Sequence, residues 1–299
     1  IDAEVLYPPV YSPIFFKTGL AKKDREGHLA FIRGYNDFIA EEYCKVAPDR
    51  LIHMGLIPET GVDDAIAEMK RCKELGIKSV SFHQFPNGTA EANAKEDDMF
   101  WDKALEWDMA LSPHGGFGGN RGAVMPQAAS GTGGIQFPQA IMQRAQGPVF
   151  GMVHLMVNGT LDRFPKLRIY LAETNVSWMP WSLFALDDSY KMFNQAFDQK
   201  LKMLPSEYVR EHFLFSFIRD ALAMKMRDYV PVDNLMWGSD FPHSVGSFPN
   251  SQEWIDIIFD GVPADIRNKV LLDVPAGYFG LDLNKPITET VSVEKALAR

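Results

Sequence analysis

The alternation of short β-forming runs with longer stretches of helical period most limits how this chain can fold. Seven apolar runs rich in β-branched and aromatic residues have the length of strands. They lie at residues 3–7, 51–57, 77–82, 109–112, 168–173, 213–217 and 234–238. Between the second and third runs, apolar side chains recur at helical spacing from Val62 to Leu75, and Gly76 then offers a natural helix stop. This order predicts βα units around a parallel sheet.

The number of predicted strands favours one barrel-like domain. No linker or break in composition divides the 299 residues, so we expect a single domain over 1–299. A (β/α)8 TIM barrel needs eight strands, and the seven runs therefore predict a barrel whose first strand precedes Ile1. An open doubly wound sheet would instead place a glycine-rich phosphate-binding turn after its first strand. The glycine-rich stretch at 115–134 follows the fourth run and has no nucleotide-binding pattern, which favours the α/β barrel.

Composition narrows the classes of partner. The formal net charge of −9 argues against nucleic acid, because proteins that bind a phosphate backbone carry a basic face. No apolar stretch approaches the roughly 20 residues that a membrane-spanning helix needs. The two cysteines, Cys44 and Cys72, cannot form a disulfide framework, which favours a reducing compartment. We therefore expect a cytoplasmic protein that acts on a small molecule.

Polar side chains stand at or just after the ends of five predicted strands. These residues are His83, His114, Glu173, Asp220 and Asp240. Because the carboxyl ends of barrel strands meet at one mouth, residues far apart in sequence would form one set there. A charged group such as Glu173 at the end of an apolar strand is costly to bury unless it is paired or bound. Imidazoles and carboxylates together are ligands for zinc or a related divalent ion.

Each of these residues also has a purely structural explanation. Asp240 in "LMWGSDFPHS" is either a turn residue that accepts hydrogen bonds from neighbouring amides or a metal ligand. Asp220 would serve equally as the N-cap of a helix in "ALAMKMRDY". His83 is either a ligand contact or a turn residue, and His114 taken singly is an ordinary loop histidine. His243 either shuttles a proton or supports Asp240 as a hydrogen-bonding partner.

Three stretches together resemble the metal-dependent amidohydrolase-related family (amidohydrolase 2). They are "DNLMWGSDFPHS", "LSPHGG" and "GTLDRFPKLRIYLAETNVSWMPW". The resemblance extends in order over nearly the whole chain, and it includes the branch of aminocarboxymuconate-semialdehyde decarboxylase and the resorcylate-type decarboxylases. It implies a barrel of the metal-dependent hydrolase type with one divalent metal ion, zinc or manganese, in its mouth. Homodimers are common in that family.

By position in that family, His114 and Asp240 would be metal ligands, and Asp240 would also move a proton as a catalytic residue. Family members carry a further ligand pair, His-x-His or Glu-x-His, on the first strand, which we expect upstream of Ile1. The sixth strand of characterised decarboxylases usually ends in histidine, whereas this chain has Glu173. A carboxylate can act as a base or hold a water molecule, so Glu173 is a candidate catalytic residue. Its presence shifts the expected reaction towards hydrolysis.

We therefore expect a metal-dependent hydrolase of a small aromatic or cyclic carboxylic acid derivative. The alternatives are a non-oxidative decarboxylase of such an acid and a barrel that binds a small acid without catalysis. The candidates for substrate binding are His83, Arg121, Trp178 and His243, with Arg121 placed to grip a carboxylate. Aromatic residues near the predicted mouth would form a flat slot or pack in the core, which is their commoner role. These are Phe82, Phe85, Phe117, Trp178, Trp181 and Phe241.

Overall fold

A computed structural model describes residues 2–8, 23–88, 93–114, 117, 146–196 and 200–286 of the chain. Its centre is a parallel sheet of seven strands whose order in space equals their order in the sequence. The strands are β1 (Glu4–Leu6), β2 (Leu51–Leu56), β3 (Ser79–Phe82), β4 (Ala110–Pro113), β5 (Ile169–Leu171), β6 (Phe213–Phe217) and β7 (Leu235–Trp237). Each of the seven predicted runs contains or overlaps one of these strands, so the predicted parallel α/β sheet is confirmed.

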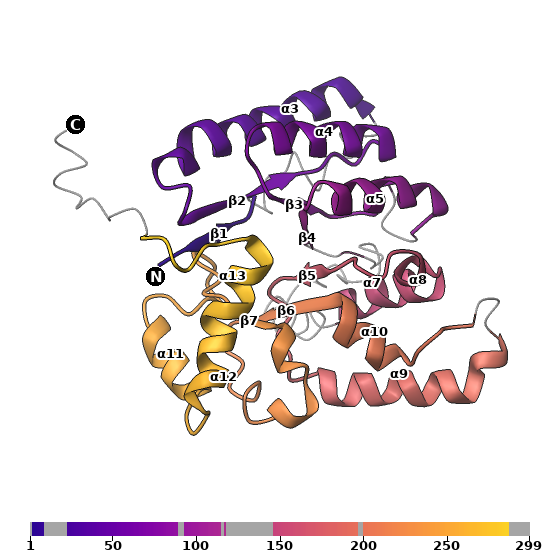
Figure 1. The fold of residues 1–299 in the computed structure, drawn as a ribbon, viewed down its shortest axis with the longest axis vertical. Helices are drawn as coiled ribbons and strands as arrows, with labels where there is room; N and C mark the ends of the chain where they lie inside the picture. Colours follow the sequence, from indigo (N-terminus) through magenta and orange to yellow (C-terminus); the bar gives the residue numbers. More distant parts are fainter. Residues whose placement is uncertain are drawn as a thin grey trace, which may run out of the picture.

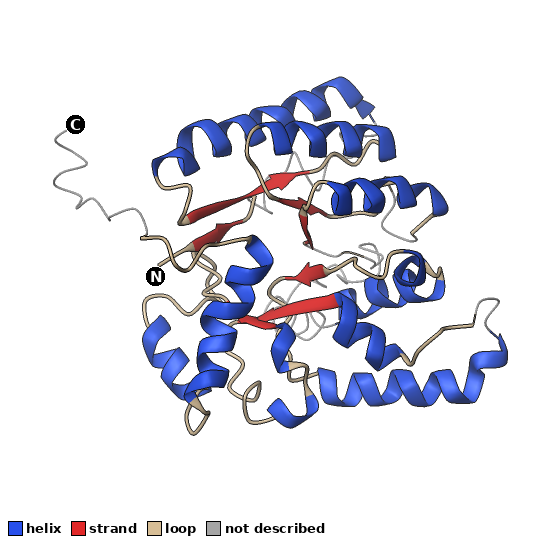
Figure 2. Cartoon of the chain, viewed as in Figure 1, coloured by secondary structure: helices blue, strands red, loops and turns tan. Residues whose placement is uncertain are grey.

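Helices surround the sheet on its outside, and the strands occupy the middle of the molecule (Figures 1 and 2). They are α3 (Arg25–Phe38), α4 (Val62–Glu74), α5 (Asp98–Glu106), α7 (Gln146–Val157), α8 (Thr160–Arg163), α9 (Met179–Phe193), α10 (Pro205–His212), α11 (Ser251–Ile258), α12 (Ala264–Asn268) and α13 (Val274–Phe279). From β1 to β6 the chain passes from a strand to one or more α-helices and then to the next parallel strand, which is the predicted βα order. The connection from β6 to β7 instead contains two short 3-10 helices, Arg227–Tyr229 and Val232–Asn234.

Helix α4 shows how the local sequence fixes an element. Its apolar side buries Val62, Ala65 and Met69 against the sheet, as the helical spacing predicts. Acidic residues lie in its first turn and basic residues in its last, where each complements the helix dipole. Gly76, with φ +82°, then turns the chain in the left-handed conformation towards β3.

The apolar side chains form two layers, one on each face of the sheet. The larger layer lies between the sheet and the surrounding helices, and it includes Val80, Leu111 and Phe215. The second layer joins β2, β5, β6 and β7 to α13. Its buried members are Ile52, Met54, Tyr170, Leu214, Met236 and Phe279.

Side chains from β2 can meet those from β5 to β7 in one cluster only if the sheet curls around them. The curled parallel sheet is therefore of the TIM-barrel type. No pairing between β7 and β1 occurs within the described part of the chain. The expected additional first strand and the single domain over 1–299 stay predictions.

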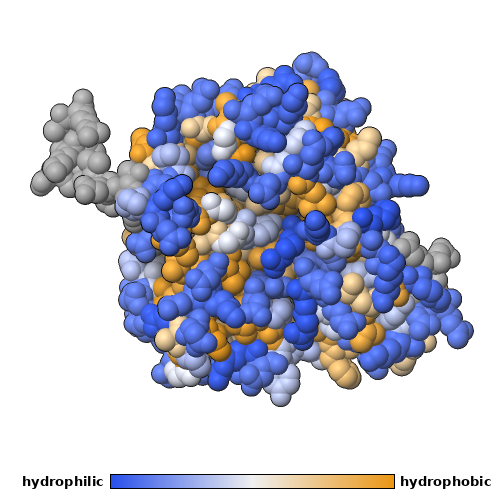
Figure 3. All heavy atoms as spheres, viewed as in Figure 1, coloured by the Kyte–Doolittle hydropathy of each residue, from blue (hydrophilic) through white to orange (hydrophobic). Residues whose placement is uncertain are grey.

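The molecular surface is mixed in character. Hydrophilic residues cover most of the face in Figure 3, and apolar residues are gathered in a furrow across its middle. Among the helices that the structure describes, none is both long and apolar enough to cross a membrane.

Candidate functional site

Four of the predicted side chains come together beyond the carboxyl ends of β4, β5 and β7. His114 directly follows β4, and its Nε2 lies 3.3 Å from Oε1 of Glu173, which follows β5. Nδ1 of His243 lies 2.5 Å from Oδ1 of Asp240 in the loop after β7. Glu173, Asp240 and His243 each offer a ligand atom, and these atoms lie within 4.8 Å of one another. The carboxyl ends of the strands therefore bring together residues that are up to 129 positions apart (243 − 114).

Two of these residues have a backbone conformation that is rare outside glycine. Glu173 has φ +59° and Asp240 has φ +55°. A non-glycine residue in this region persists only where its surroundings hold it, and such residues cluster at functional sites. Glu173 lies two residues after the end of β5, and Asp240 lies three residues after the end of β7. The left-handed backbone of Glu173 is incompatible with a strand, so β5 stops at Leu171 although the apolar run predicts a strand to Glu173.

The loop after β7 wraps tightly around the Asp240 backbone. The amide of His243 donates to the Asp240 carbonyl at 2.9 Å, and the amide of Gly246 donates to the His243 carbonyl at 2.9 Å. A Cβ atom at Gly246 would lie 2.8 Å from the carbonyl oxygens of both Asp240 and Ser239. Only glycine fits this position without displacing the backbone that carries Asp240.

His83 and Tyr7 both contact His114. The His83 Nδ1 atom lies 2.5 Å from the His114 carbonyl oxygen and therefore donates to it. The Tyr7 ring lies 4.9 Å from the His114 ring, centroid to centroid, and the Tyr7 hydroxyl is 2.5 Å from Oγ of Ser112. Burial, with a smaller effect of the Glu173 charge, raises the pKa of Tyr7 well above its ordinary value. Tyr7 thus stays a neutral phenol beside the site.

Tyr7 was missed as a site residue, although a signal was present. It closes the first apolar run, 3–7, and stands at the same end of its strand as the predicted site residues do on theirs. The predicted site consisted of charged groups and histidines at strand ends. A tyrosine in that position satisfies the same geometric criterion.

Asp220 does not cap a helix. Residues 221–226 form turns, and its carboxylate instead accepts hydrogen bonds from the amides of Val176 and Ser177, both at 2.9 Å, and from the Ser177 hydroxyl. The expected helix in "ALAMKMRDY" is therefore wrong, because the side chain that would have begun it is used by the loop after β5. Asp220 is also outside the group of possible metal ligands found among the described residues.

The predicted aromatic slot is only partly compatible with the structure. Phe82, Phe85 and Phe117 are almost fully buried and pack on one another in the larger apolar layer, so core packing is the role that the structure gives them. The indole N–H of Trp178 donates hydrogen bonds to the carbonyl oxygens of Thr174 and Asn175 in the loop after β5.

Two other members of that set are exposed. Trp181 is 75% exposed, and Phe241 is 55% exposed with its ring 5.0 Å from that of Phe248. Arg121 lies outside the described residues, so its expected role stays a prediction.

The site has the chemistry of a metal centre. Glu173, Asp240, His114 and His243 supply carboxylate oxygens and imidazole nitrogens, a donor set that suits zinc and manganese. Nδ1 of His114 is buried and has no hydrogen-bonding partner within the described part of the chain. A buried polar atom of this kind is costly unless a ligand or ion meets it. The residues present therefore fit a divalent ion.

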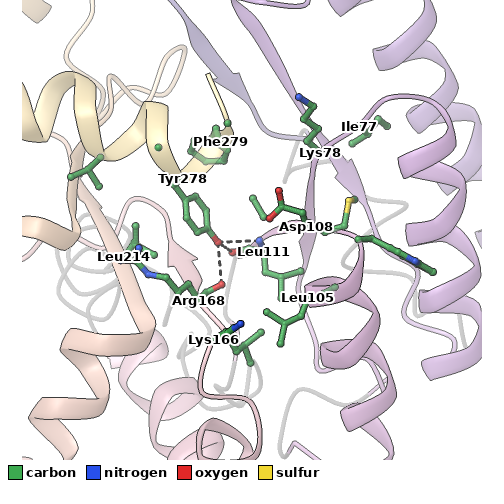
Figure 4. A pocket seen from close by; sticks show the side chains of 18 of the residues that line it. Ile77, Lys78, Leu105, Asp108, Leu111, Lys166, Arg168, Leu214, Tyr278 and Phe279 are labelled. Atoms are coloured by element: carbon green, nitrogen blue, oxygen red, sulfur yellow. Dashed lines mark hydrogen bonds between the residues drawn. The ribbon is translucent and has the colours of Figure 1, made fainter. Parts of the chain in front are cut away.

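A separate cavity of about 660 Å³ lies at the opposite, amino-terminal end of the strands. Figure 4 shows Lys78, Asp108, Lys166 and Arg168 around it, with Tyr278 of α13 reaching between β4 and β5. The Tyr278 hydroxyl accepts from the Leu111 amide at 3.0 Å and donates to the Leu111 carbonyl at 2.7 Å. In barrel enzymes this end of the strands contributes to stability and the other end carries the chemistry. We therefore place the candidate site at the carboxyl ends alone.

A curled parallel sheet with helices outside, and with convergent polar groups beyond the carboxyl ends of its strands, defines a barrel-type α/β enzyme. A family model described as "Amidohydrolase" matches residues 22–281, and the chain therefore belongs to the amidohydrolase family. The resemblance stated from the sequence motifs is confirmed, and so is the prediction of an enzyme. A search of curated proteins found no match.

Several solved structures share the fold. A 2,6-dihydroxybenzoate decarboxylase from Rhizobium is 18% identical with a TM-score of 0.72, and the match covers 94% of this chain and 84% of that chain. A 5-carboxyvanillate decarboxylase from Novosphingobium aromaticivorans DSM 12444, complexed with manganese and 4-hydroxy-3-methoxy-5-nitrobenzoic acid, is 20% identical with a TM-score of 0.74, covering 94% and 77%. An amidohydrolase from Mycobacterium avium subsp. paratuberculosis K-10 is 20% identical with a TM-score of 0.69, covering 88% and 67%. At these identities the likeness concerns the fold.

Proposed function

We propose that this chain is a metal-dependent decarboxylase of a small aromatic or cyclic carboxylic acid. The observation that carries the proposal is the convergence of Glu173, Asp240 and His243, with His114 alongside, beyond the carboxyl ends of the strands. The fold is shared with decarboxylases of dihydroxybenzoate and carboxyvanillate. This support favours decarboxylation over the hydrolysis that the sequence motifs led us to expect first.

One divalent ion, zinc or manganese, is the proposed cofactor, and Glu173, Asp240, His243 and His114 are the residues that would hold it. When bound, such an ion supplies positive charge that orients a carboxylate or phenolate oxygen of the substrate. Manganese is bound in the similar carboxyvanillate decarboxylase. His83 and Trp178 stay candidates for substrate binding at this mouth, and a homodimer stays a prediction.

Asp240 and His243 are the proposed proton-handling pair. In a non-oxidative decarboxylation, the bond between the ring carbon and the carboxyl carbon breaks, and its electron pair stays on the ring carbon. A proton must then arrive at that carbon as carbon dioxide leaves. Asp240 is the proposed donor of this proton, and His243, with Nδ1 2.5 Å from the Asp240 oxygen, holds the carboxyl group in orientation.

A hydrolase of an aromatic or cyclic acid derivative is the second candidate, and Glu173 is the observation that favours it. This carboxylate stands where the resembling decarboxylases usually carry histidine, and its Oε1 lies 3.3 Å from Nε2 of His114. A carboxylate paired with an imidazole is suited to accept a proton from water. The two candidates differ in product, because only the decarboxylase releases carbon dioxide.

The test is to load the protein with Mn²⁺ or Zn²⁺ and to assay 2,6-dihydroxybenzoate, 5-carboxyvanillate and related acids for carbon dioxide under nitrogen. We expect release that depends on the metal and falls at least about 100-fold in Asp240→Asn, because general acid catalysis typically contributes that much. Asp228→Asn, at an exposed carboxylate outside the group of possible metal ligands, is the matched control and should keep full activity. Hydrolysis of esters, amides or lactones without carbon dioxide release would favour the second candidate. Absence of any metal-dependent turnover would favour the third hypothesis, a barrel that binds a small acid without catalysis.

A further inference from the structure

The loop that carries Glu173 is tied to the neighbouring strand β6 at successive positions. The Glu173 amide donates to Oγ of Ser216 at 2.9 Å, and the Asn175 amide donates to the Ser216 carbonyl at 3.1 Å. The Ile218 amide in turn donates to Oδ1 of Asn175 at 3.2 Å. These bonds place the start of the loop against the end of β6.

Asp220 completes this attachment from the turn after β6. Its side chain is buried, and its carboxylate accepts the amides of Val176 and Ser177 at 2.9 Å each and the Ser177 hydroxyl. No cation pairs with it among the residues that the structure describes. The two amides and the hydroxyl therefore compensate the cost of burying its charge, as in other carboxylates that accept several backbone N–H groups.

The loop needs such an attachment because its backbone is strained. Glu173 has φ +59° and Asn175 has φ +53°, and both residues carry a Cβ atom that disfavours this conformation. Two left-handed residues within three positions would relax towards extended or right-handed backbone if nothing held them. Relaxation would rotate the Glu173 side chain away from His114, Asp240 and His243.

We propose that Asp220 is a positioning residue, which holds the loop 173–178 in its strained conformation and thereby keeps the Glu173 carboxylate at the metal-binding mouth. Asp220 touches neither the proposed ion nor the substrate and acts through Glu173. The metal-binding consequence rests on the proposed function, whereas the effect on the loop does not.

A double-substitution cycle on Mn²⁺ affinity, measured by calorimetric titration, tests the action through Glu173. Asp220→Asn should weaken Mn²⁺ binding by roughly 10- to 100-fold, the range expected when support for a ligand is lost. In the Glu173→Gln background the same substitution should change affinity less than about twofold, because the ligand it positions is already altered. Asp228→Asn, exposed in the segment that follows Asp220, is the control and should bind like the unsubstituted chain. Equal losses in both backgrounds would overturn the proposal, since a general loss of structure is independent of Glu173.

Amide hydrogen exchange of the segment 173–178 tests the loop without any metal. Exchange should be faster in Asp220→Asn than in Asp228→Asn, while segments in β2 and α4 keep their protection. Ser177→Ala removes one of the three donors and is the milder variant if Asp220→Asn does not fold. Unchanged protection of 173–178 in the folded variant would overturn the proposal. Failure of the unsubstituted chain to bind Mn²⁺ would instead contradict the proposed function, and the exchange result would still decide the role of Asp220.

Discussion

At the scale of single residues, Gly246 has the most clearly defined constraint near the candidate site. A Cβ atom there would lie 2.8 Å from the carbonyl oxygens of Ser239 and Asp240, so Gly246→Ala must displace the backbone of a proposed ligand. We expect it to destabilise the fold by about 1–3 kcal/mol, as overpacking does, and to weaken Mn²⁺ binding. Urea unfolding and metal titration measure the two effects.

Gly34→Ala is the matched control for this substitution. Gly34 lies within α3, and nothing comes within 4 Å of a Cβ atom built on it. Alanine should therefore stabilise the helix by about 0.5–1 kcal/mol and leave metal binding unchanged. If Gly246→Ala behaved like Gly34→Ala, the tight loop around Asp240 would not constrain the site.

Residues of the site differ in how far sequence could identify them. His114, Glu173, Asp240 and His243 carry ionisable groups after apolar runs, and a barrel collects such positions at one end. Ser216 could not be found in this way, because a hydroxyl inside an apolar strand gives no local sign of the amide it will accept. Asp220 was found at a strand end, but its role could not be predicted, because its amide partners lie 43 and 44 positions earlier in the chain.

At the scale of elements, sequence predicted where strands occur more reliably than where they end. All seven strands fall in or overlap the predicted runs, because apolar β-forming residues mark buried parallel strands. The predicted run 168–173 is longer than β5, which ends at Leu171. The difference arises from the left-handed backbone of Glu173, which no hydrophobic pattern signals.

The contact between α13 and the strands β4 and β5 gives a prediction at this scale. These strands share a single registered residue pair, Leu111 with Ile169, and the Tyr278 hydroxyl bonds both the amide and the carbonyl of Leu111. Tyr278→Phe leaves these two backbone groups without that partner, so it should cost about 1–3 kcal/mol of unfolding free energy. Tyr229→Phe, at an exposed position, should change the unfolding free energy by less than about 0.5 kcal/mol. Equal effects in urea unfolding would show that the Tyr278 contact does not stabilise the sheet.

At the scale of the whole molecule, buried and half-buried tyrosines make stability depend on alkaline pH. Burial raises the pKa of Tyr7, Tyr170 and Tyr278 above the ordinary value of 10.0. Below pH 10 these phenols are neutral in both the folded and the unfolded chain. As pH rises above 10, the unfolded chain loses their protons first, so the free energy of unfolding falls until the folded pKa is reached. Each such tyrosine contributes up to about 1.4 kcal/mol per pH unit in that window.

Urea unfolding between pH 9 and 11 checks this dependence. The unsubstituted chain should lose stability steeply above pH 10, and Tyr170→Phe should lessen the slope because one titrating group is gone. Tyr229→Phe, which removes an exposed phenol, should leave the slope unchanged. A slope that is the same in all three proteins would show that the buried phenols do not govern alkaline unfolding.

Metal binding at the mouth should also be visible in the stability of the whole molecule. A ligand that binds only the folded state stabilises it by an amount that grows with the logarithm of its free concentration relative to Kd, about 2.7 kcal/mol at a concentration 100-fold above Kd. Glu173, Asp240 and His243 lie on the loops after β5 and β7, so an ion held between them would join two parts of the barrel that are far apart in sequence. We therefore expect Mn²⁺ to raise the melting temperature of the chelator-treated protein. Asp240→Asn should lose most of this response, whereas Asp228→Asn should keep it. An equal rise in both variants would place the ion elsewhere on the molecule, and the proposed site would then be wrong.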